Sequence, residues 1–302
     1  MFENSYRLKA LFAVTVWGAS FVAAKIALEE IQPVTLITLR FAMGLAVILF
    51  LAARARALRR ISARDFAFLA LLGLISIALH QALQANGLVF TSASSMAWLV
   101  GLNPVFTALL AWLFLSEKFN ALKIAGLAIA LFGALVVVTH GAFTFDVLRL
   151  PSTVGDLLAL ASALNWAIFS VASKPMLRRM SPLLMIAYVM TLGWIFVLPF
   201  FAAAQGWSDI ANLSARGWLA IIFLGVLCSG VAYIFWYDAL QKIDATQAAA
   251  YIYLEPLVTV LVAIAFATET FTLTTFVGGL TILAGVYLVN RPVVREARVA
   301  AD

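Results

Sequence analysis

The chain has few charged residues, and this shortage limits what kind of protein it can be. Only 11% of its 302 residues are charged, 65% are hydrophobic, and the mean hydropathy is +1.05. An average soluble domain has about 25% charged residues, so this composition cannot supply the surface of a soluble protein. It excludes a soluble enzyme, a disordered chain and a nucleic-acid-binding domain, and it indicates a protein with the lipid bilayer as its partner.

Residues that build metal centres and disulfides are also scarce. There is one cysteine, Cys228, and there are two histidines, His80 and His140. One cysteine excludes an internal disulfide framework and a multi-cysteine metal site. The sequence also lacks a P-loop, an H-E-x-x-H motif and a G-x-S-x-G motif, the usual signs of ATP use, zinc hydrolysis and a serine nucleophile. We therefore expect no enzyme activity, no cofactor and no metal.

The apolar residues form long runs of the length that crosses a bilayer as a helix, about 20 residues. Cutting the sequence at its charged and turn-forming residues predicts ten spans, at 10–29, 34–53, 65–85, 94–115, 121–139, 155–173, 183–203, 216–237, 246–267 and 272–290. We interpret the first run as a retained span and not a signal peptide, because further spans follow it. The connections are short, which predicts one compact all-α bundle.

The basic residues predict the orientation, because cytoplasmic loops carry an excess of Lys and Arg. With the N-terminus inside, sixteen basic residues fall on the inner side and two on the outer side. Both termini, including a tail at 293–302, should therefore be cytoplasmic. The densest cluster, 54–64, is expected to anchor this topology, with an anionic-lipid site as the alternative.

The sequence repeats itself. Trp17, Lys25 and Pro33 recur 149 residues later as Trp166, Lys174 and Pro182. Further along, the offset is 152 residues, and it relates Leu102-Asn103-Pro104 to Leu254-Glu255-Pro256, Glu117 and Phe119 to Glu269 and Phe271, and Gly126 and Gly133 to Gly278 and Gly285. These matches predict a first repeat at 1–145 and a second at 152–292. Each has five spans, an odd number, so the second should enter the membrane from the opposite side. Such inverted repeats are typical of transporters, although a duplication without a transport role would leave the same pattern.

Some of these residues carry a family resemblance. The segment Trp17-Gly-Ala-Ser-Phe-Val-Ala-Ala-Lys25 resembles the first-span motif of the drug/metabolite transporter superfamily, and Pro104 and Glu117 resemble the end of its EamA-type repeat. Within the superfamily the chain is similar to the YddG-type exporters of aromatic amino acids. This resemblance implies a ten-helix bundle around a central cavity in the bacterial cytoplasmic (inner) membrane. It also implies a secondary transporter that exports aromatic and other neutral amino acids by alternating access.

Another small solute remains an alternative cargo, such as a drug-like cation or a nucleotide-linked metabolite. Anionic phosphates would need several buried basic residues, and only Lys25 and Arg40 are candidates within the spans.

Polar residues within spans are costly and usually face the bundle interior. They follow helical spacing in three predicted spans, as Ser76, His80, Gln84 and Thr91; as Ser95, Asn103 and Thr107; and as Gln247, Tyr251, Glu255 and Thr259. These lines predict a water-filled cavity, with helix–helix hydrogen bonds as the alternative.

Glu255 is the only acid that the predicted boundaries place deep in a span. It could carry a proton, attract a substrate ammonium group, or bond within the bundle. Pro104 and Pro256 each remove a backbone donor near the middle of a span, which predicts a bend there. Such a bend could be a hinge or a static kink.

Deep aromatic rings suit planar or apolar ligands, with ordinary core packing as the alternative. With the polar residues, they complete the expected substrate-binding set: Trp17, His80, Gln84, Trp98, Asn103, Trp166, Tyr233, Trp236, Tyr237, Tyr251 and Glu255. Spans 121–139 and 272–290 instead carry small residues, which predicts packing within the scaffold or in a homodimer.

Overall fold

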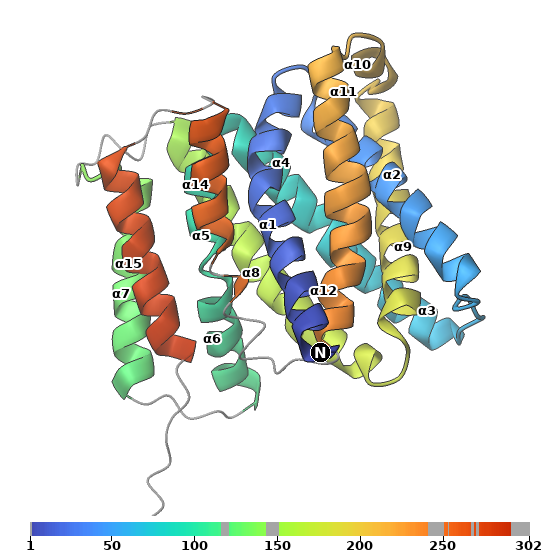
Figure 1. The fold of residues 1–302 in the computed structure, drawn as a ribbon, viewed down its shortest axis with the longest axis horizontal. Helices are drawn as coiled ribbons and strands as arrows, with labels where there is room; N and C mark the ends of the chain where they lie inside the picture. Colours follow the sequence, from blue (N-terminus) through green and yellow to red (C-terminus); the bar gives the residue numbers. More distant parts are fainter. Residues whose placement is uncertain are drawn as a thin grey trace, which may run out of the picture.

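The computed structural model describes residues 2–115, 121–142, 151–240, 251–252, 254–266, 269 and 272–290. Within these ranges the chain forms helices and no strand, and the helices pack side by side into one bundle (Figure 1). The elements are α1 (Phe2–Leu28), α2 (Pro33–Arg54), α3 (Ala63–Gly73), η1 (Leu74–Leu79), α4 (His80–Phe90), α5 (Ala93–Val100), α6 (Asn103–Leu115), α7 (Ala121–Val138), α8 (Pro151–Leu177), α9 (Pro182–Ala203), α10 (Trp207–Ala211), α11 (Ala215–Ile222), η3 (Phe223–Val231), α12 (Ala232–Leu240), α14 (Glu255–Ala265) and α15 (Leu273–Asn290).

The helices have the length and composition of membrane spans. In the described part of the chain, eight are long and apolar enough to cross a bilayer, and the shorter helices 255–265 and 273–289 are also apolar. The prediction of an all-α, multi-pass membrane protein is therefore confirmed. Residues 246–250 of the ninth predicted span and the predicted tail lie outside the described residues.

The two ends of the bundle carry different charges. The N-terminal end of α1 and the C-terminal end of α15 lie at the same end (Figure 1). The loop 55–62 and the α8–α9 turn also lie there and contribute arginines, so we call this the basic end. The α1–α2 turn at the opposite, acidic end carries Glu29 and Glu30.

The repeats make matching contacts. Helix α2 meets η3 where Gly44 lies against the backbone of Gly225 and Ser229. Helix α9 meets the α3–η1 segment where Gly193 lies against the backbone of Gly73. The repeat offsets relate Gly44 to Gly193 and Gly73 to Gly225, so the two contacts are equivalent. The second span of each repeat therefore packs against the third span of the other repeat.

Two π-helical segments occupy equivalent positions in the repeats. Segment η1 continues α3 into α4, and η3 continues α11 into α12, with no break in either span. A π-helix bonds each residue to the fifth along and is wider than an α-helix. Residues beyond it therefore face other directions than regular α-helical spacing predicts.

Helix breaks lie at the positions where the sequence predicts bends. Helix α5 ends at Val100, and α6 begins at Asn103, directly before Pro104. In the second repeat α14 begins at Glu255, directly before Pro256. The hinge role of the two prolines stays a prediction.

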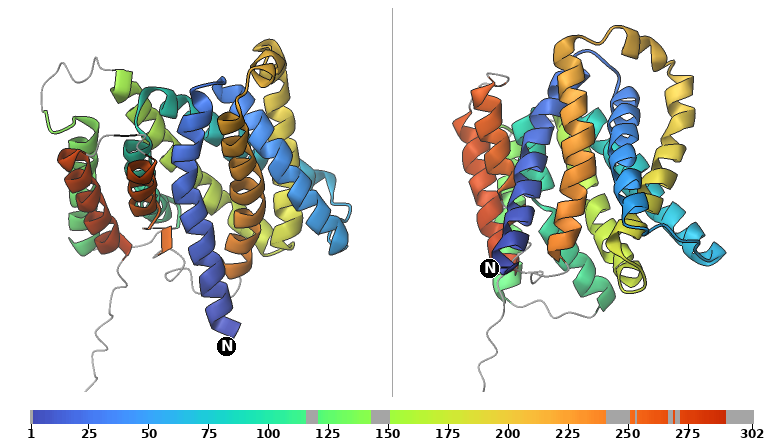
Figure 2. Two further views of the ribbon diagram at one scale, coloured as in Figure 1. Left: turned by 45° about the horizontal axis from the view of Figure 1, so that its top comes forward. Right: turned by 45° about the vertical axis from the view of Figure 1, so that its right-hand side comes forward.

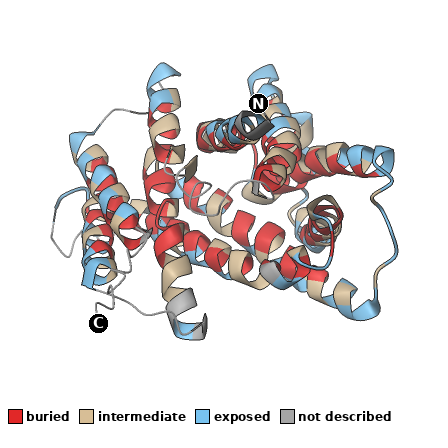
Figure 3. Cartoon of the chain, turned by 60° about the horizontal axis from the view of Figure 1, so that its bottom comes forward, coloured by how far each residue is buried: buried red, intermediate tan, exposed pale blue. Residues whose placement is uncertain are grey.

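Helices α7 and α15 form a closely packed pair at one side of the bundle (Figures 1 and 2). Gly126 lies against the backbone of Gly285, and Gly133 lies against that of Gly278. The contacts run in opposite directions along the two helices, so the pair is antiparallel, as inverted repeats require. Elsewhere buried positions follow the inner sides of the helices, and exposed ones gather on outer sides and at helix ends (Figure 3).

Candidate functional site

A large cavity lies between the two repeats, and none of its lining residues comes from the α7–α15 pair. Its volume is about 710 Å³, including the space open to solvent. It is lined by Trp17, Ser20, Phe21, Arg40, His80, Gln81, Gln84, Val100, Asn103, Trp166, Tyr233, Trp236, Ile252 and Glu255. These residues come from both repeats, so the cavity depends on their packing against each other.

Most of the lining consists of positions that the repeat relates. Five equivalent pairs face the cavity: Trp17 and Trp166, Gln81 and Tyr233, Gln84 and Trp236, Val100 and Ile252, and Asn103 and Glu255. The cavity therefore lies where the two halves meet symmetrically. Its chemistry is asymmetric, because the third and fourth spans contribute amides from the first repeat and aromatic rings and a carboxyl from the second.

Trp17 is held by the second repeat. Its indole Nε1 donates a hydrogen bond to the backbone carbonyl of Cys228 at 3.1 Å. Its ring lies 5.4 Å from that of Tyr233 and 5.5 Å from that of Trp236, measured between centroids. Such tilted and edge-on contacts are favourable between aromatic rings. Together the three rings form one wall of the cavity.

A second group of rings is built around Trp166 on α8. Its ring lies 5.0 Å from that of His80 and 5.2 Å from that of Phe169. The Nδ1 atom of His80 lies 3.1 Å from the carbonyl oxygen of Ser162, within hydrogen-bonding distance. This contact leaves Nε2 as the ring nitrogen available toward the cavity.

Glu255 is positioned by the close approach of α1 and α14. A side chain at Gly18 would come within 2.7 Å of the Glu255 carbonyl oxygen, so only glycine permits this spacing. The hydroxyl of Thr259 lies 2.7 Å from the Gly18 carbonyl and 2.9 Å from that of Glu255. The Glu255 side chain is half-buried and, among the described residues, forms no ion pair.

Arg40 brings a second charge to the cavity from α2, where it is 8% exposed. Its Nε donates to the Ser229 hydroxyl at 3.1 Å, and its Nη1 donates to the Gln81 side-chain oxygen at 3.2 Å. Its guanidinium lies 5.1 Å from the centre of the Phe41 ring. The sequence reasoning did not include Arg40 or Gln81 in the substrate-binding set.

Eight of the eleven residues expected to bind substrate line this cavity, and three do not. Trp98 is fully buried between α5 and α15, against Gly279 and Phe276, and its indole nitrogen has no partner among the described residues. Tyr237 lines a smaller cavity, and Tyr251 packs half-buried against the core. Substrate binding by any of the eleven stays a prediction.

The predicted polar lines are only partly aligned with the cavity. Ser76 turns to bond the Leu72 carbonyl, and Thr107 bonds the side chain of Asn103. Ser95 is buried outside the cavity. Gln247 lies outside the described residues.

A second acid, Asp156, is buried near the start of α8, at one end of a predicted span and not deep within it. Asp156 on α8 is fully buried, and one of its oxygens accepts a hydrogen bond from Thr91 at 2.5 Å. Lys25 donates to the carbonyls of Leu88 and Thr91 at the C-terminal end of α4. Lys25 therefore caps a helix, an arrangement that its positive charge favours.

Two smaller cavities adjoin the large one and are related by the repeat. One is lined by residues that include Ser20, Leu36, Ile37, Arg40, Gln81 and Ala85. The other is lined by their equivalents Phe169, Met185, Ile186, Val189, Tyr233 and Tyr237. The first extends toward the acidic end and the second toward the basic end, as the positions of these residues along their helices show.

Comparison with known proteins identifies the family. The model of the EamA-like transporter family matches residues 5–139 and 153–291. The chain belongs to the EamA-like transporter family. Each matched stretch falls within one predicted repeat, and this EamA-like protein is accordingly a transporter of the drug/metabolite superfamily.

Several relatives of this EamA-like chain match over nearly its whole length. An uncharacterized transporter of Archaeoglobus fulgidus is 31% identical, covering 95% of this chain and 98% of its own. A probable terminal-alkyne amino-acid exporter of Streptantibioticus cattleyicolor is 30% identical, covering 96% and 95%. A probable amino-acid metabolite efflux pump of Escherichia coli is 26% identical, covering 92% of each.

A crystal structure with 19% sequence identity superposes with a TM-score of 0.66 over 94% of this chain and 95% of the other. At this level of identity, the likeness shows that the fold is shared.

Proposed function

We propose that the protein is a secondary transporter that exports amino acids, aromatic and other neutral ones preferred, across the bacterial cytoplasmic membrane. The observation that carries this proposal is the cavity between the repeats, where Trp17, Tyr233 and Trp236 form an aromatic wall beside Glu255. Apolar walls with a few fixed polar groups are typical of small-molecule sites. Two relatives with amino-acid export or efflux in their names support the cargo.

Alternating access is the mechanism that the arrangement favours. The cavity lies between inverted repeats, where transporters commonly hold their substrate. The two smaller, repeat-related cavities extend from it toward opposite ends of the bundle. In our proposal each is the start of one half of the pathway. The basic end then faces the cytoplasm, as the distribution of Lys and Arg predicts.

The proposal is tested by counterflow in proteoliposomes that contain only this protein. Vesicles are loaded with one unlabelled solute, and uptake of the same labelled solute is followed for phenylalanine, tryptophan, threonine, an aromatic organic cation and a nucleotide sugar. Phenylalanine or tryptophan counterflow above that of protein-free vesicles is the expected result. Counterflow of the cation or the nucleotide sugar, without counterflow of any amino acid, would overturn the proposal that amino acids are the cargo. It would favour a transporter of drug-like cations or nucleotide-linked metabolites.

A further inference from the structure

Arg40 carries a buried positive charge that the described part of the fold does not neutralise. Its protein partners are the hydroxyl of Ser229 and the amide oxygen of Gln81, both uncharged. A guanidinium has five N–H donors, and these contacts use two of them. Burying a charge without an opposite charge is costly, so the remaining donors are expected to serve an anion that comes from outside the fold.

Arg40 lines both the large cavity and the smaller one toward the acidic end, so a ligand in either lies beside this residue. The edge of a guanidinium matches a carboxylate in shape and can donate two parallel hydrogen bonds to it. Ser229 and Gln81 fix the orientation of the guanidinium. A small anion in the cavity would thus meet a preformed cationic site.

Glu255 provides the opposite charge in the same cavity. The contact of α14 with Gly18 fixes its backbone, and among the described residues no ion pair engages its carboxyl. Glu255 and Arg40 both line the cavity, and no ion pair between them is formed among the described residues.

Neither of these two charges has a charged equivalent in the other repeat. The position equivalent to Arg40 is Val189, and the position equivalent to Glu255 is Asn103. Each charge thus occurs once in a cavity whose other features come largely in equivalent pairs. A ligand with two opposite charges would bind in one orientation only.

We infer that the cavity recognises its cargo as a zwitterion, with the carboxylate at Arg40, the ammonium group at Glu255, and the side chain against Trp17 and Trp236. This inference rests on the proposed function and narrows it to free α-amino acids with uncharged side chains. Amines without a carboxylate, and acids without an ammonium group, leave one buried charge unpaired and bind more weakly.

The experiment measures binding of three ligands to the purified full chain in detergent, by tryptophan fluorescence. Phenylalanine has both charges, phenethylamine lacks the carboxylate, and phenylpropanoate lacks the ammonium group. We expect wild type to prefer phenylalanine over each analogue by about 10- to 100-fold, the range for hydrogen bonds between charged groups.

The variants separate the two ends of the site. Arg40→Gln should bind phenylalanine and phenethylamine equally but still reject phenylpropanoate. Glu255→Gln should bind phenylalanine and phenylpropanoate equally but still reject phenethylamine. Arg40→Lys keeps the charge but not the forked geometry, and should show an intermediate preference if Arg40→Gln does not fold. Arg60→Gln, at an exposed position in the loop 55–62, is the control and should behave as wild type.

Two outcomes would overturn the inference. Wild type could bind phenethylamine or phenylpropanoate as tightly as phenylalanine, or both variants could weaken all three ligands by the same factor. In either case amino-acid counterflow could still occur, and the proposed function would stand. Absence of both amino-acid binding and amino-acid counterflow in wild type would overturn the two together.

Discussion

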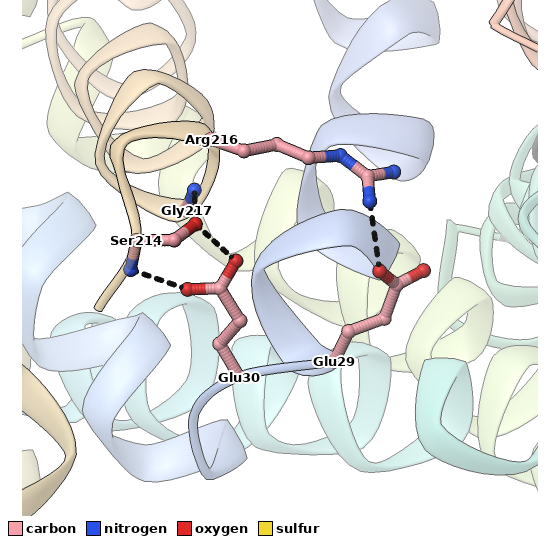
Figure 4. A network of polar contacts seen from close by, with 5 residues as sticks. All are labelled: Glu29, Glu30, Ser214, Arg216 and Gly217. Carbon is pink, nitrogen blue, oxygen red and sulfur yellow. Dashed lines mark hydrogen bonds and ion pairs between the residues drawn. The ribbon is translucent and has the colours of Figure 1, made fainter. Parts of the chain in front are cut away.

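The carboxylate of Glu30 accepts two hydrogen bonds from Ser214, from its backbone N–H at 2.7 Å and from its hydroxyl at 2.6 Å (Figure 4). This contact joins the α1–α2 turn to the start of α11, beside an ion pair of Glu29 with Arg216. At the basic end, Arg179 pairs with Asp65 at 2.9 Å and joins the α8–α9 turn to the start of α3. The repeat relates Glu30 to Arg179, so equivalent positions with opposite charges join equivalent segments at the two ends.

Weakening either contact should favour opening at that end. We expect Glu30→Gln to increase labelling of Ser20→Cys in the cavity by a membrane-impermeant thiol reagent applied at the acidic end. Arg179→Gln should decrease it, because the alternative opening becomes more populated. An exposed ion pair such as Arg179–Asp65 contributes about 0.2–1 kcal/mol, so a change of about 1.4- to fivefold is expected for Arg179→Gln. Arg60→Gln, an equal change of charge at the basic end, is the control, and parallel changes in both variants would contradict the account.

The contact at Glu30 should also be sensitive to acid. Hydrogen bonds from the hydroxyl and the backbone of Ser214, helped by the charge of Arg216, hold the pKa of Glu30 below its usual value of 4.5. Since the folded pKa is lowered, the carboxylate stabilises the fold above pH 4.5 and this contribution is lost as the pH falls further. The difference in melting temperature between wild type and Glu30→Gln should therefore narrow below this pH. A difference that stays constant down to about pH 3 would contradict the prediction.

Gly18 should be sensitive to the smallest enlargement. A methyl group there would meet the carbonyl of Glu255 and the side chain of Val258. We expect Gly18→Ala to cost about 1–3 kcal/mol, as overpacking typically does, and to raise the KM for phenylalanine by displacing Glu255. The equivalent position, Ala167, already carries that methyl group. Ala167→Gly is the matched control and should leave KM unchanged, whereas equal KM values in wild type and Gly18→Ala would refute a positioning role.

Trp98 and Trp17 should respond differently to the same substitution. Trp98 packs between helices away from the cavity, so Trp98→Phe should lower the melting temperature without changing which amino acids compete in counterflow. Trp17 forms part of the cavity wall, so Trp17→Phe should change that order of preference. A changed order of amino-acid preference in Trp98→Phe would contradict this assignment and indicate that Trp98 affects substrate binding.

The repeat and the apolar runs were enough to predict the helical membrane fold and the positions of the helix breaks. They also led to Trp17, Trp166, Asn103 and Glu255, because equivalent positions of inverted repeats meet where the halves join. These features follow from the spacing of residues along the sequence, which does not depend on how the side chains pack.

Other parts of the site depend on packing that spacing does not record. A tryptophan in a span can line a cavity or fill a helix interface. Trp98 fills an interface, because Gly279 on α15 has no side chain and the Trp98 ring packs against it. The π-helical turns of η1 rotate the start of α4 about the helix axis, so Gln81 joins His80 and Gln84 at the cavity while Ser76 does not. Arg40 could equally have extended along its helix toward a membrane surface, and Ser229 and Gln81 hold it inward.

The most direct test of the central claim is whether an amino acid occupies the cavity. A Cys228→Ser background, in which Ser20→Cys supplies the reactive thiol, allows labelling of the cavity to be timed with and without phenylalanine. Ser208→Cys, exposed on α10, provides the control site. We predict that phenylalanine slows labelling at position 20 in proportion to its occupancy and leaves position 208 unaffected. Labelling at position 20 that proceeds equally fast at saturating phenylalanine, in a preparation that shows phenylalanine counterflow, would contradict the account.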